Sequence, residues 1–285
     1  MNLPRETSAT LFNGRHFNRE IIVLCVRWYV SYKLSYRDLV AIMAKRNIDV
    51  THTTMLRWVQ RYVPEFAKRW RRYARPVGTS WRVDETYIKM KGTWAYLYRG
   101  VDKAGQTIDF FLSKHRDIAA ATRFLQQAIE KRGVPQKITL DGYAASHKAV
   151  AALQQEQVLP ADLVVRTNRY LNNVIEQDHR RVKQRVRPML GFKCFAHAVI
   201  TLSGIELVHQ MKKGQFDISA LCAPQARSPQ VWEAVLAALV IVSSMLFFVL
   251  NIQFAPQPVR GPQSPSLESC TPLPVKERGR VRVEN

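Results

Sequence analysis

The sequence predicts an α/β protein in which an all-helical N-terminal domain precedes a domain built on a mixed five-stranded sheet with flanking helices. Three observations support this prediction. Before residue 75, apolar residues recur at the spacing of amphipathic helices. Between residues 81 and 112, apolar and polar residues alternate in three runs separated by turn residues, which is typical of antiparallel strands. After residue 115, longer helical segments alternate with short apolar runs.

The N-terminal region contains three predicted helices. The first is expected from about residue 18, where Ile21 and Trp28 share an apolar face. Ser35 and Asp38 form a variant of the capping box, so the second helix is expected to begin there. The third is expected from residue 51 to about residue 62, because Pro64 lies just beyond that point.

The second and third predicted helices are separated by a short turn and form a candidate helix-turn-helix. An ordinary helical hairpin with a solvated basic face is the alternative. The basic run at residues 68–75, with its interleaved aromatic residues, favours DNA binding. The third helix would then present these side chains to a major groove: Thr53, Thr54, Arg57 and Arg61.

The chain carries a large excess of positive charge, with 43 Lys and Arg against 22 Asp and Glu and a formal net charge of +21. Such an excess repels itself in a folded chain, so a polyanionic partner is expected. Double-stranded DNA is favoured over a membrane surface or an acidic protein. The four cysteines are far apart, which argues against a zinc ribbon and a secreted disulfide framework. The N-terminal residues lack the apolar core of a signal peptide, so a cytoplasmic location is expected.

The second region is expected to contain a meander of three strands, after which helices alternate with two more strands. The expected strands are residues 81–90, 94–101, 107–112, 138–140 and 163–166, and the expected helices are residues 118–131, 144–155, 173–186 and 196–211. This order of elements is that of a ribonuclease-H-like domain.

Three acids fall where such a domain would place metal ligands. Asp84 lies inside the first strand, Asp141 directly follows the fourth, and Glu176 lies in the first turn of a late helix. Cleavage and transfer of a DNA strand pass through an anionic transition state, which two divalent cations about 4 Å apart can stabilise. Mg²⁺ prefers oxygen ligands, so three converging carboxylates form a candidate metal site. Glu85 and Asp178 point in other directions and are interpreted as solvated surface groups.

The spacing of the three acids is specific. Thirty-four residues separate Asp141 from Glu176, and Lys183 follows Glu176 by seven positions, on the same helix face. This pattern resembles the DDE transposases and the retroviral-type integrases. More narrowly, nine segments resemble the transposases of the IS-six family of bacterial insertion sequences, namely residues 14–17, 26–29, 34–37, 57–62, 81–87, 94–98, 170–176, 191–193 and 204–206.

The resemblance implies a transposase whose helix-turn-helix binds the terminal inverted repeats of the element. It implies that an RNase H-like domain cuts the element ends and joins them to target DNA. Four residues would be catalytic: Asp84, Asp141, Glu176 and Lys183. The three acids would hold two Mg²⁺ ions, for which Mn²⁺ substitutes, and Lys183 would contact DNA beside them. Action on both ends implies at least a homodimer, working at the nucleoid in the bacterial cytoplasm.

We expect five segments: a flexible arm at 1–14, a helix-turn-helix domain at 15–75, the catalytic domain at 80–215, an accessory segment with an apolar helix at 216–254, and a Pro-rich disordered tail at 255–285. Two other functions stay open. The first is a non-catalytic DNA-binding repressor derived from a transposase, against which the intact acids argue. The second is a membrane-associated protein anchored by residues 234–250, which are short of the about 20 apolar residues that a span needs.

Overall fold

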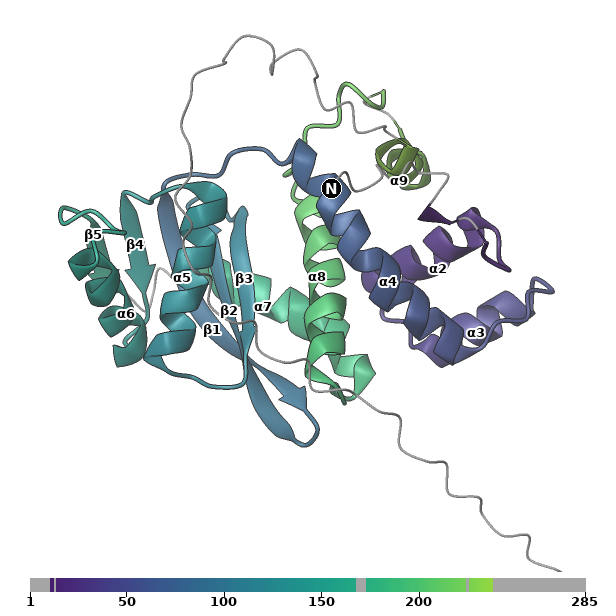
Figure 1. Ribbon diagram of the computed structural model, residues 1–285, viewed down its shortest axis with the longest axis horizontal. Coiled ribbons are helices and arrows are strands. Elements are labelled where there is room, and N and C mark those ends of the chain that lie inside the picture. Colours follow the sequence, from purple (N-terminus) through teal and green to yellow (C-terminus); the bar gives the residue numbers. More distant parts are fainter. Residues whose placement is uncertain (1–10, 13, 168–172, 224–225, 238–285) are drawn as a thin grey trace, which may run out of the picture. The chain divides into compact units, whose positions relative to one another are not determined.

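A computed structural model gives the structure of residues 11–12, 14–167, 173–223 and 226–237. These residues form eight α-helices and one five-stranded sheet (Figure 1). The predicted Pro-rich tail at 255–285, and most of the predicted arm at 1–14, lie outside the described residues.

Three helices come first: α2 (Arg19–Ser31), α3 (Tyr36–Ala44) and α4 (His52–Trp70). The predicted capping box at the start of α3 is confirmed. The backbone N–H of Asp38 donates to the Ser35 hydroxyl, and the backbone N–H of Ser35 donates to the Asp38 carboxylate. Both bonds satisfy backbone donors that a helix start leaves free, so they fix where α3 begins.

The helix α4 is longer than the sequence suggests. Its predicted end near residue 62 is wrong, because the helix continues through Pro64 to Trp70. A proline inside a helix costs about 3 kcal/mol, since it removes one hydrogen bond and crowds the preceding turn. Val63, Phe66 and Trp70 are buried in the helical core. Burial of such side chains contributes about 1.5–3 kcal/mol each, which outweighs the cost of the proline.

The prediction of a flexible arm at 1–14 is wrong at two described positions. Leu11 and Phe12 are buried, and the Phe12 ring stacks on Tyr62 of α4 with centroids 4.8 Å apart. These apolar residues stand in an otherwise polar segment, and the gain from burying them holds this point of the chain against α4.

The sheet is mixed, as predicted. Its order is β3-β2-β1-β4-β5, in which β1, β2 and β3 are antiparallel neighbours and β4 and β5 run parallel to β1. The strands are β1 (Ser80–Met90), β2 (Thr93–Asp102), β3 (Thr107–Ser113), β4 (Lys137–Leu140) and β5 (Val164–Thr167). The helices that follow β3 are α5 (Ile118–Arg132), α6 (Ala144–Gln155), α7 (Asn173–Val186) and α8 (Phe195–Lys212). The predicted ribonuclease-H-like order is therefore confirmed.

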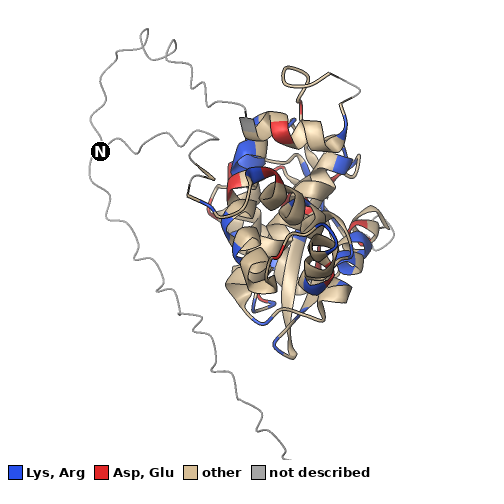
Figure 2. Cartoon of the chain, turned by 90° about the vertical axis from the view of Figure 1, so that its right-hand side faces the viewer, with Lys and Arg blue, Asp and Glu red and all other residues tan. Residues whose placement is uncertain are grey.

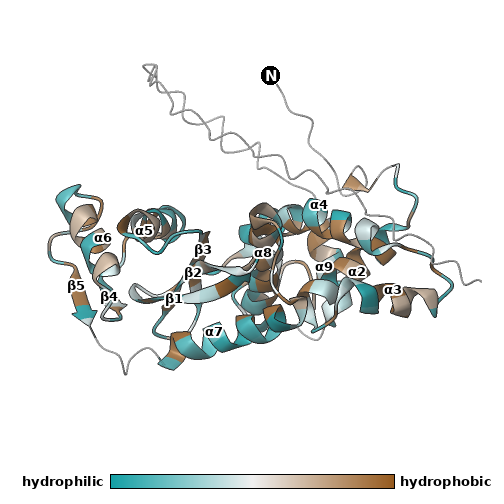
Figure 3. Cartoon of the chain, turned by 90° about the horizontal axis from the view of Figure 1, so that it is seen from below, coloured by the Kyte–Doolittle hydropathy of each residue, from teal (hydrophilic) through white to brown (hydrophobic). Residues whose placement is uncertain are grey.

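Helices cover both faces of the sheet, which Figure 3 shows between α5 and α6 on one side and α7 on the other. Apolar residues of β1, β2 and β4 pack with α5 and α6, whereas the opposite face packs with α7 and α8. Side chains alternate along a strand, so the even-numbered core residues of β1 face α7 and α8 and the odd-numbered ones face α5 and α6. This alternation decides the surroundings of the acids at positions 84 and 85.

The N-terminal helices share their hydrophobic core with the last described part of the chain. Leu207 and Val208 of α8 lie in the same buried cluster as residues of α2, α3 and α4. Trp232 of α9 (Ser228–Ala237) joins this cluster and packs edge-on against Phe66, with ring centroids 5.4 Å apart. The helices within 15–75 therefore bury apolar surface against residues beyond position 200.

Gly204 lets α8 approach α2 and α4 closely. A Cβ atom at this position would lie 2.7 Å from Cγ1 of Val30 and 3.0 Å from Cγ1 of Val63. Packed carbons are normally about 3.5–4.0 Å apart. The first residue of the segment 204–206, which carries part of the family resemblance, therefore has a packing role.

The apolar run at 234–250 is described as far as Ala237, and its remainder lies outside the described residues. Val235 and Leu236 are buried in the helical core. Within the part of the chain that the structure covers, no helix has the length and apolar character that a membrane span requires.

Candidate active site

Two of the predicted acids meet at one end of the sheet. Asp84 lies within β1, and Asp141 directly follows β4. The pairing of β1 with β4 ends at Arg82 and Thr139. Asp84 and Asp141 each lie two residues beyond that last pair, so they are at the same level along the two strands, where the strands are no longer hydrogen-bonded to each other. One carboxylate oxygen each from Asp84, Glu85 and Asp141 lies within 4.8 Å of the others. The short strand β4 thus opens the space in which these three acids converge.

This carboxylate group changes the chemistry of Asp84. Burial, followed by the negative charges of Glu85 and Asp141, raises the pKa of Asp84 to about 7. A cation bound between the acids would stabilise the ionised form. Among the described residues, Asp84, Glu85 and Asp141 are the group of three acids, histidines or cysteines whose ligand atoms lie close enough together to share one ion. Their all-oxygen donor set suits Mg²⁺ or Mn²⁺.

Glu176 and Lys183 are both exposed on α7. Glu176 is not one of the three acids whose oxygens lie within 4.8 Å of one another. Its negative charge nevertheless contributes to the raised pKa of Asp84, although less than burial and the charges of Glu85 and Asp141 do. The structure therefore brings Asp84 and Asp141 together and places Glu176 within electrostatic range of Asp84.

Sequence reasoning missed His179, which also lies at this site. Its Nδ1 is 3.6 Å from Oδ2 of Asp84. Burial, followed by the positive charges of Arg99 and Lys183, lowers the pKa of His179 to about 3, so the ring is neutral at pH 7. A neutral ring beside Asp84 does not balance the charge of that carboxylate. The available sequence signal was its place three residues after Glu176, on the same side of the helix.

The prediction that Glu85 is a solvated group is wrong. Its side chain is 2% exposed, and its Oε1 lies 2.5 Å from a guanidinium nitrogen of Arg116. The same guanidinium lies 3.7 Å from the ring centroid of Tyr143 and 4.0 Å from Oδ2 of Asp141. Alternation along β1 does direct Glu85 away from α7. The opposite face is covered by α5 and the segment before it, so the carboxylate is buried there.

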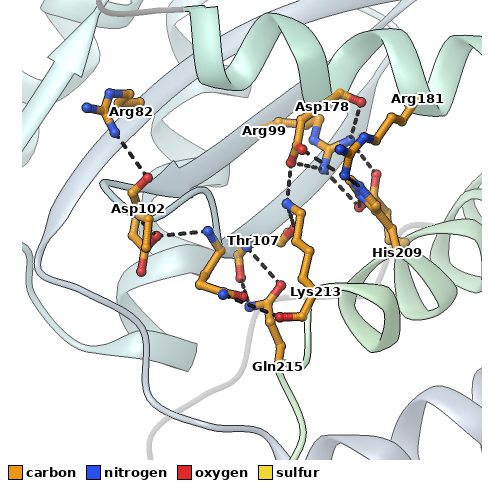
Figure 4. Close-up of polar contacts among 12 residues, drawn as sticks. Arg82, Arg99, Asp102, Thr107, Asp178, Arg181, His209, Lys213 and Gln215 are labelled. Carbon is orange, nitrogen blue, oxygen red and sulfur yellow. Dashed lines mark hydrogen bonds and ion pairs between the residues drawn. The ribbon is translucent and has the colours of Figure 1, made fainter.

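The prediction that Asp178 is solvated is also wrong, because Asp178 lies on the buried side of α7. Its Oδ2 accepts hydrogen bonds from Arg99 of β2 at 3.1 Å and from Nζ of Lys213 at 2.5 Å (Figure 4). The fully buried Arg99 guanidinium also lies 2.8 Å from a carboxylate oxygen of Glu206 in α8. The position of Asp178 two residues after Glu176 did not indicate that buried charged groups of β2 and of the region around α8 lie beside it.

We call Arg99, Asp178, Glu206 and Lys213 the buried ion cluster. Burial alone would raise the pKa of Glu206, but the adjacent Arg99 guanidinium lowers it overall, which keeps the carboxylate ionised. Arg99 is also the direct cross-strand neighbour of Asp84 in the β1–β2 ladder. The cluster therefore fixes α7 against the position on β2 that pairs with Asp84.

Arg185 joins the same helix to the N-terminal helices. Its buried guanidinium donates to the backbone oxygens of Tyr29 and Leu34. It also lies over the Tyr29 ring, 4.8 Å from the centroid. The helix α7 thus carries candidate site residues on one side and a contact with α2 on another.

The predicted DNA-binding residues of α4 differ in exposure. Thr53, Arg57 and Arg61 are exposed, whereas Thr54 is half-buried. The Oγ1 of Thr54 lies 3.0 Å from Oγ1 of Thr51, and its backbone N–H donates to the same hydroxyl at the helix start. Three of the four side chains are therefore open to solvent, and Thr54 is engaged in the cap.

Lys and Arg occur on many helices of the described structure, as Figure 2 shows. Figure 3 shows α7 as mostly hydrophilic, in contrast to the apolar α8. Exposed basic residues on α7 include Arg180, Arg181 and Lys183. Basic side chains therefore lie on the helix that also carries Glu176.

A family model described as a DDE domain matches residues 78–215, which include all three predicted acids. The transposase for the insertion sequence-like element IS431mec of Staphylococcus aureus strain Mu50 is 39% identical over 202 residues, covering 71% of this chain and 88% of the relative. The transposase for the element IS257 in transposon Tn4003, also of Staphylococcus aureus, matches at 39% identity over 202 residues.

Two solved structures are similar at lower identity. The catalytic core domain of BIV integrase is 15% identical, covers 45% of this chain and 82% of its own, and has a TM-score of 0.35. The catalytic core domain of HTLV-2 integrase in complex with magnesium is 15% identical, covers 54% of this chain and 97% of its own, and has a TM-score of 0.39. The sequence relatives decide the family: this chain belongs to the IS-six family of insertion-sequence transposases and is an enzyme of the DDE type.

Proposed function

We propose that this transposase binds the terminal inverted repeats of its insertion sequence and catalyses metal-dependent strand cleavage and transfer, with Asp84, Asp141 and Glu176 as catalytic acids. The observation that carries the proposal is the convergence of Asp84 and Asp141 at the sheet end, where the pKa of Asp84 is about 7. Glu176 lies within electrostatic range on an exposed turn of α7.

The residues present fit Mg²⁺, with Mn²⁺ as a substitute. Both ions prefer carboxylate oxygens, and Asp84 is crowded by negative charge that a cation would relieve. Asp84 and Asp141 would hold one ion, and Glu176 would serve a second. Two such ions supply activation of the attacking oxygen and stabilisation of the leaving oxygen of the phosphodiester.

Other side chains would position the DNA. Lys183 is exposed two helical turns from Glu176, so its ammonium can bind a phosphate beside the acids. Thr53, Arg57 and Arg61 present donors from the exposed side of α4 to a major groove. Thr54 would contribute less, because the helix cap already engages its hydroxyl.

Strand transfer in vitro tests the acids. The protein is incubated with candidate element ends and Mg²⁺, and the nicks are mapped. Asp84→Asn, Asp141→Asn and Glu176→Gln should each abolish cleavage and leave end binding largely intact, because these charges serve the metal. Glu156→Gln removes an exposed acid at the far end of α6 and should keep full activity.

Near-wild-type cleavage by any of the three variants would remove that residue from the site. If the wild-type protein binds the ends but never nicks them with Mg²⁺ or Mn²⁺, the molecule acts as a DNA-binding repressor and the proposal fails.

We also propose that the active assembly is a homodimer or higher oligomer, because two element ends must be cut and joined together. Sedimentation of the protein with DNA carrying both ends measures this. A fully active complex with a single chain would contradict the proposal.

A further inference from the structure

Glu85 belongs to the carboxylate group but has no role in the acid triad. Its side chain is 2% exposed, and Arg116 binds its Oε1 at 2.5 Å. Its Oε2 is buried and has no hydrogen-bond partner among the residues that the structure describes. Leaving a buried polar atom unpaired costs about 1–3 kcal/mol, and more when the group is charged. A partner for this carboxylate oxygen would remove that cost.

The position of Glu85 points to a cation as that partner. Although Asp84 and Glu85 face opposite sides of the sheet, an oxygen of each lies within 4.8 Å of the other and of Asp141. This is possible because the pairing of β4 with β1 ends at Thr139, so Asp141 lies beyond the last paired residues of these two strands. The three acids thus surround one space from two strands.

The charges in this space match one divalent ion. Asp84, Glu85 and Asp141 carry three negative charges when ionised, and the Arg116 guanidinium carries one positive charge, which leaves a net charge of −2. An ion pair between Glu85 and Arg116 alone would leave the charge of the two aspartates unbalanced. A single divalent cation neutralises the whole group.

We infer that Glu85 is a fourth acid of the metal centre, which offers Oε2 to the cation held by Asp84 and Asp141 while Arg116 holds Oε1. This inference rests on the proposed metal site and adds a ligand outside the acid triad. Arg116 is a positioning residue in this arrangement. The Tyr143 hydroxyl donates to the backbone oxygen of Arg116 at 2.8 Å, and the backbone N–H of Tyr143 donates to Oδ1 of Asp141 at 3.0 Å. The arginine is therefore tied to the same loop that carries Asp141.

Binding of Mn²⁺ alone to the full-length protein tests the inference without any measurement of activity. The loss of the free-ion signal in electron paramagnetic resonance gives the affinity. Glu85→Gln should weaken Mn²⁺ binding by about tenfold or more, as loss of a group at a metal site does. Glu130→Gln removes an exposed acid on α5 and should leave the affinity unchanged. Unchanged affinity in a folded Glu85→Gln protein would overturn the inference.

Two further variants separate this inference from the proposed function. Asp84→Asn and Asp141→Asn should both weaken Mn²⁺ binding. If neither does, the proposed metal site fails altogether. If both weaken binding and Glu85→Gln does not, the metal site stands and only the role of Glu85 is lost.

Arg116→Gln supplies a second test if Glu85→Gln does not fold. Without Arg116, the buried Glu85 charge loses its partner, so the metal-free variant should melt at a lower temperature than the wild type. Mn²⁺ should raise the melting temperature of this variant more than that of the wild type, and Arg116→Lys should behave as the wild type does. Equal increases in all three proteins would show a structural ion pair and overturn the inference.

Discussion

The environment of Asp84 couples the active site to the stability of the fold. Its pKa is about 7 in the folded chain, because burial and then the charges of Glu85 and Asp141 raise it from 3.8. Between pH 4 and pH 7 the unfolded chain releases this proton while the folded chain keeps it. The folded state binds more protons in this window, so the free energy of unfolding of the metal-free protein should fall as the pH rises.

Asp84→Asn should abolish this pH dependence. We expect the metal-free variant to match the wild type near pH 4 and to exceed its free energy of unfolding at pH 8, by at most about 4 kcal/mol given the size of the pKa shift. Urea unfolding at the two pH values measures the difference. Mg²⁺ at pH 8 should narrow it, because the ion stabilises the wild type. A stability difference that is equal at both pH values would contradict the prediction.

At the scale of elements, the position of α7 depends on the buried ion cluster. Arg99→Met should destabilise the protein by about 3–5 kcal/mol, because Asp178 and Glu206 lose a buried positive partner. The double variant Arg99→Met with Glu206→Met should lose less, since it removes one of the stranded charges. Urea unfolding of the single and double variants gives the coupling energy. Additive losses would show that the cluster does not act as a unit.

Close packing of α8 gives a second prediction at this scale. Gly204→Ala should cost about 1–3 kcal/mol, because the new Cβ would lie 2.7 Å from Cγ1 of Val30. In a Val30→Ala protein, which lacks Cγ1 at that position, Gly204→Ala should cost less stability than it does in the wild type. Gly142→Ala, at a position with open space around the Cβ, is the stability control. A neutral Gly204→Ala would mean that α8 can move away from α2 at little cost.

At the scale of the whole molecule, the helical core joins distant parts of the chain. A fragment ending near residue 75 would expose the faces of α4 that α8 and α9 cover, including Phe66 and Trp70. We expect that fragment to aggregate. A chain truncated after Leu239 keeps α9 and should retain its melting temperature and strand transfer. Loss of folding in this truncation would show that residues 240–285 contribute to the core.

The positive charge of the molecule predicts how it binds DNA. Binding of element ends should weaken steeply as salt rises, because each phosphate contact releases counterions. Arg57→Ala or Arg61→Ala should cost about 1–3 kcal/mol where the arginine reads a base. Gel-shift titrations against the terminal repeat and a scrambled duplex separate the two effects. Equal affinity for both duplexes would place sequence recognition away from α4.

Much of the architecture followed from local patterns. Apolar periodicity and turn residues located the strands and most helix bounds, because these preferences act over a few neighbouring residues. The capping box placed the start of α3 for the same reason. The spacing from Asp141 to Glu176 indicated a DDE-type enzyme, and nine short segments indicated the IS-six family, which the sequence relatives confirm.

The tertiary structure alone decided which residues share an environment. Glu85 and Asp178 looked like surface acids, yet each meets an arginine 31 and 79 residues away in the chain, respectively. The helix α4 continues past Pro64 because α8 and α9, far along the chain, bury its apolar face. Burial and charge pairing act between neighbours in space, and those neighbours exist only after the chain has folded. Local sequence can therefore place an acid on a strand or helix, but the folded contacts determine whether it meets water, an arginine or a cation.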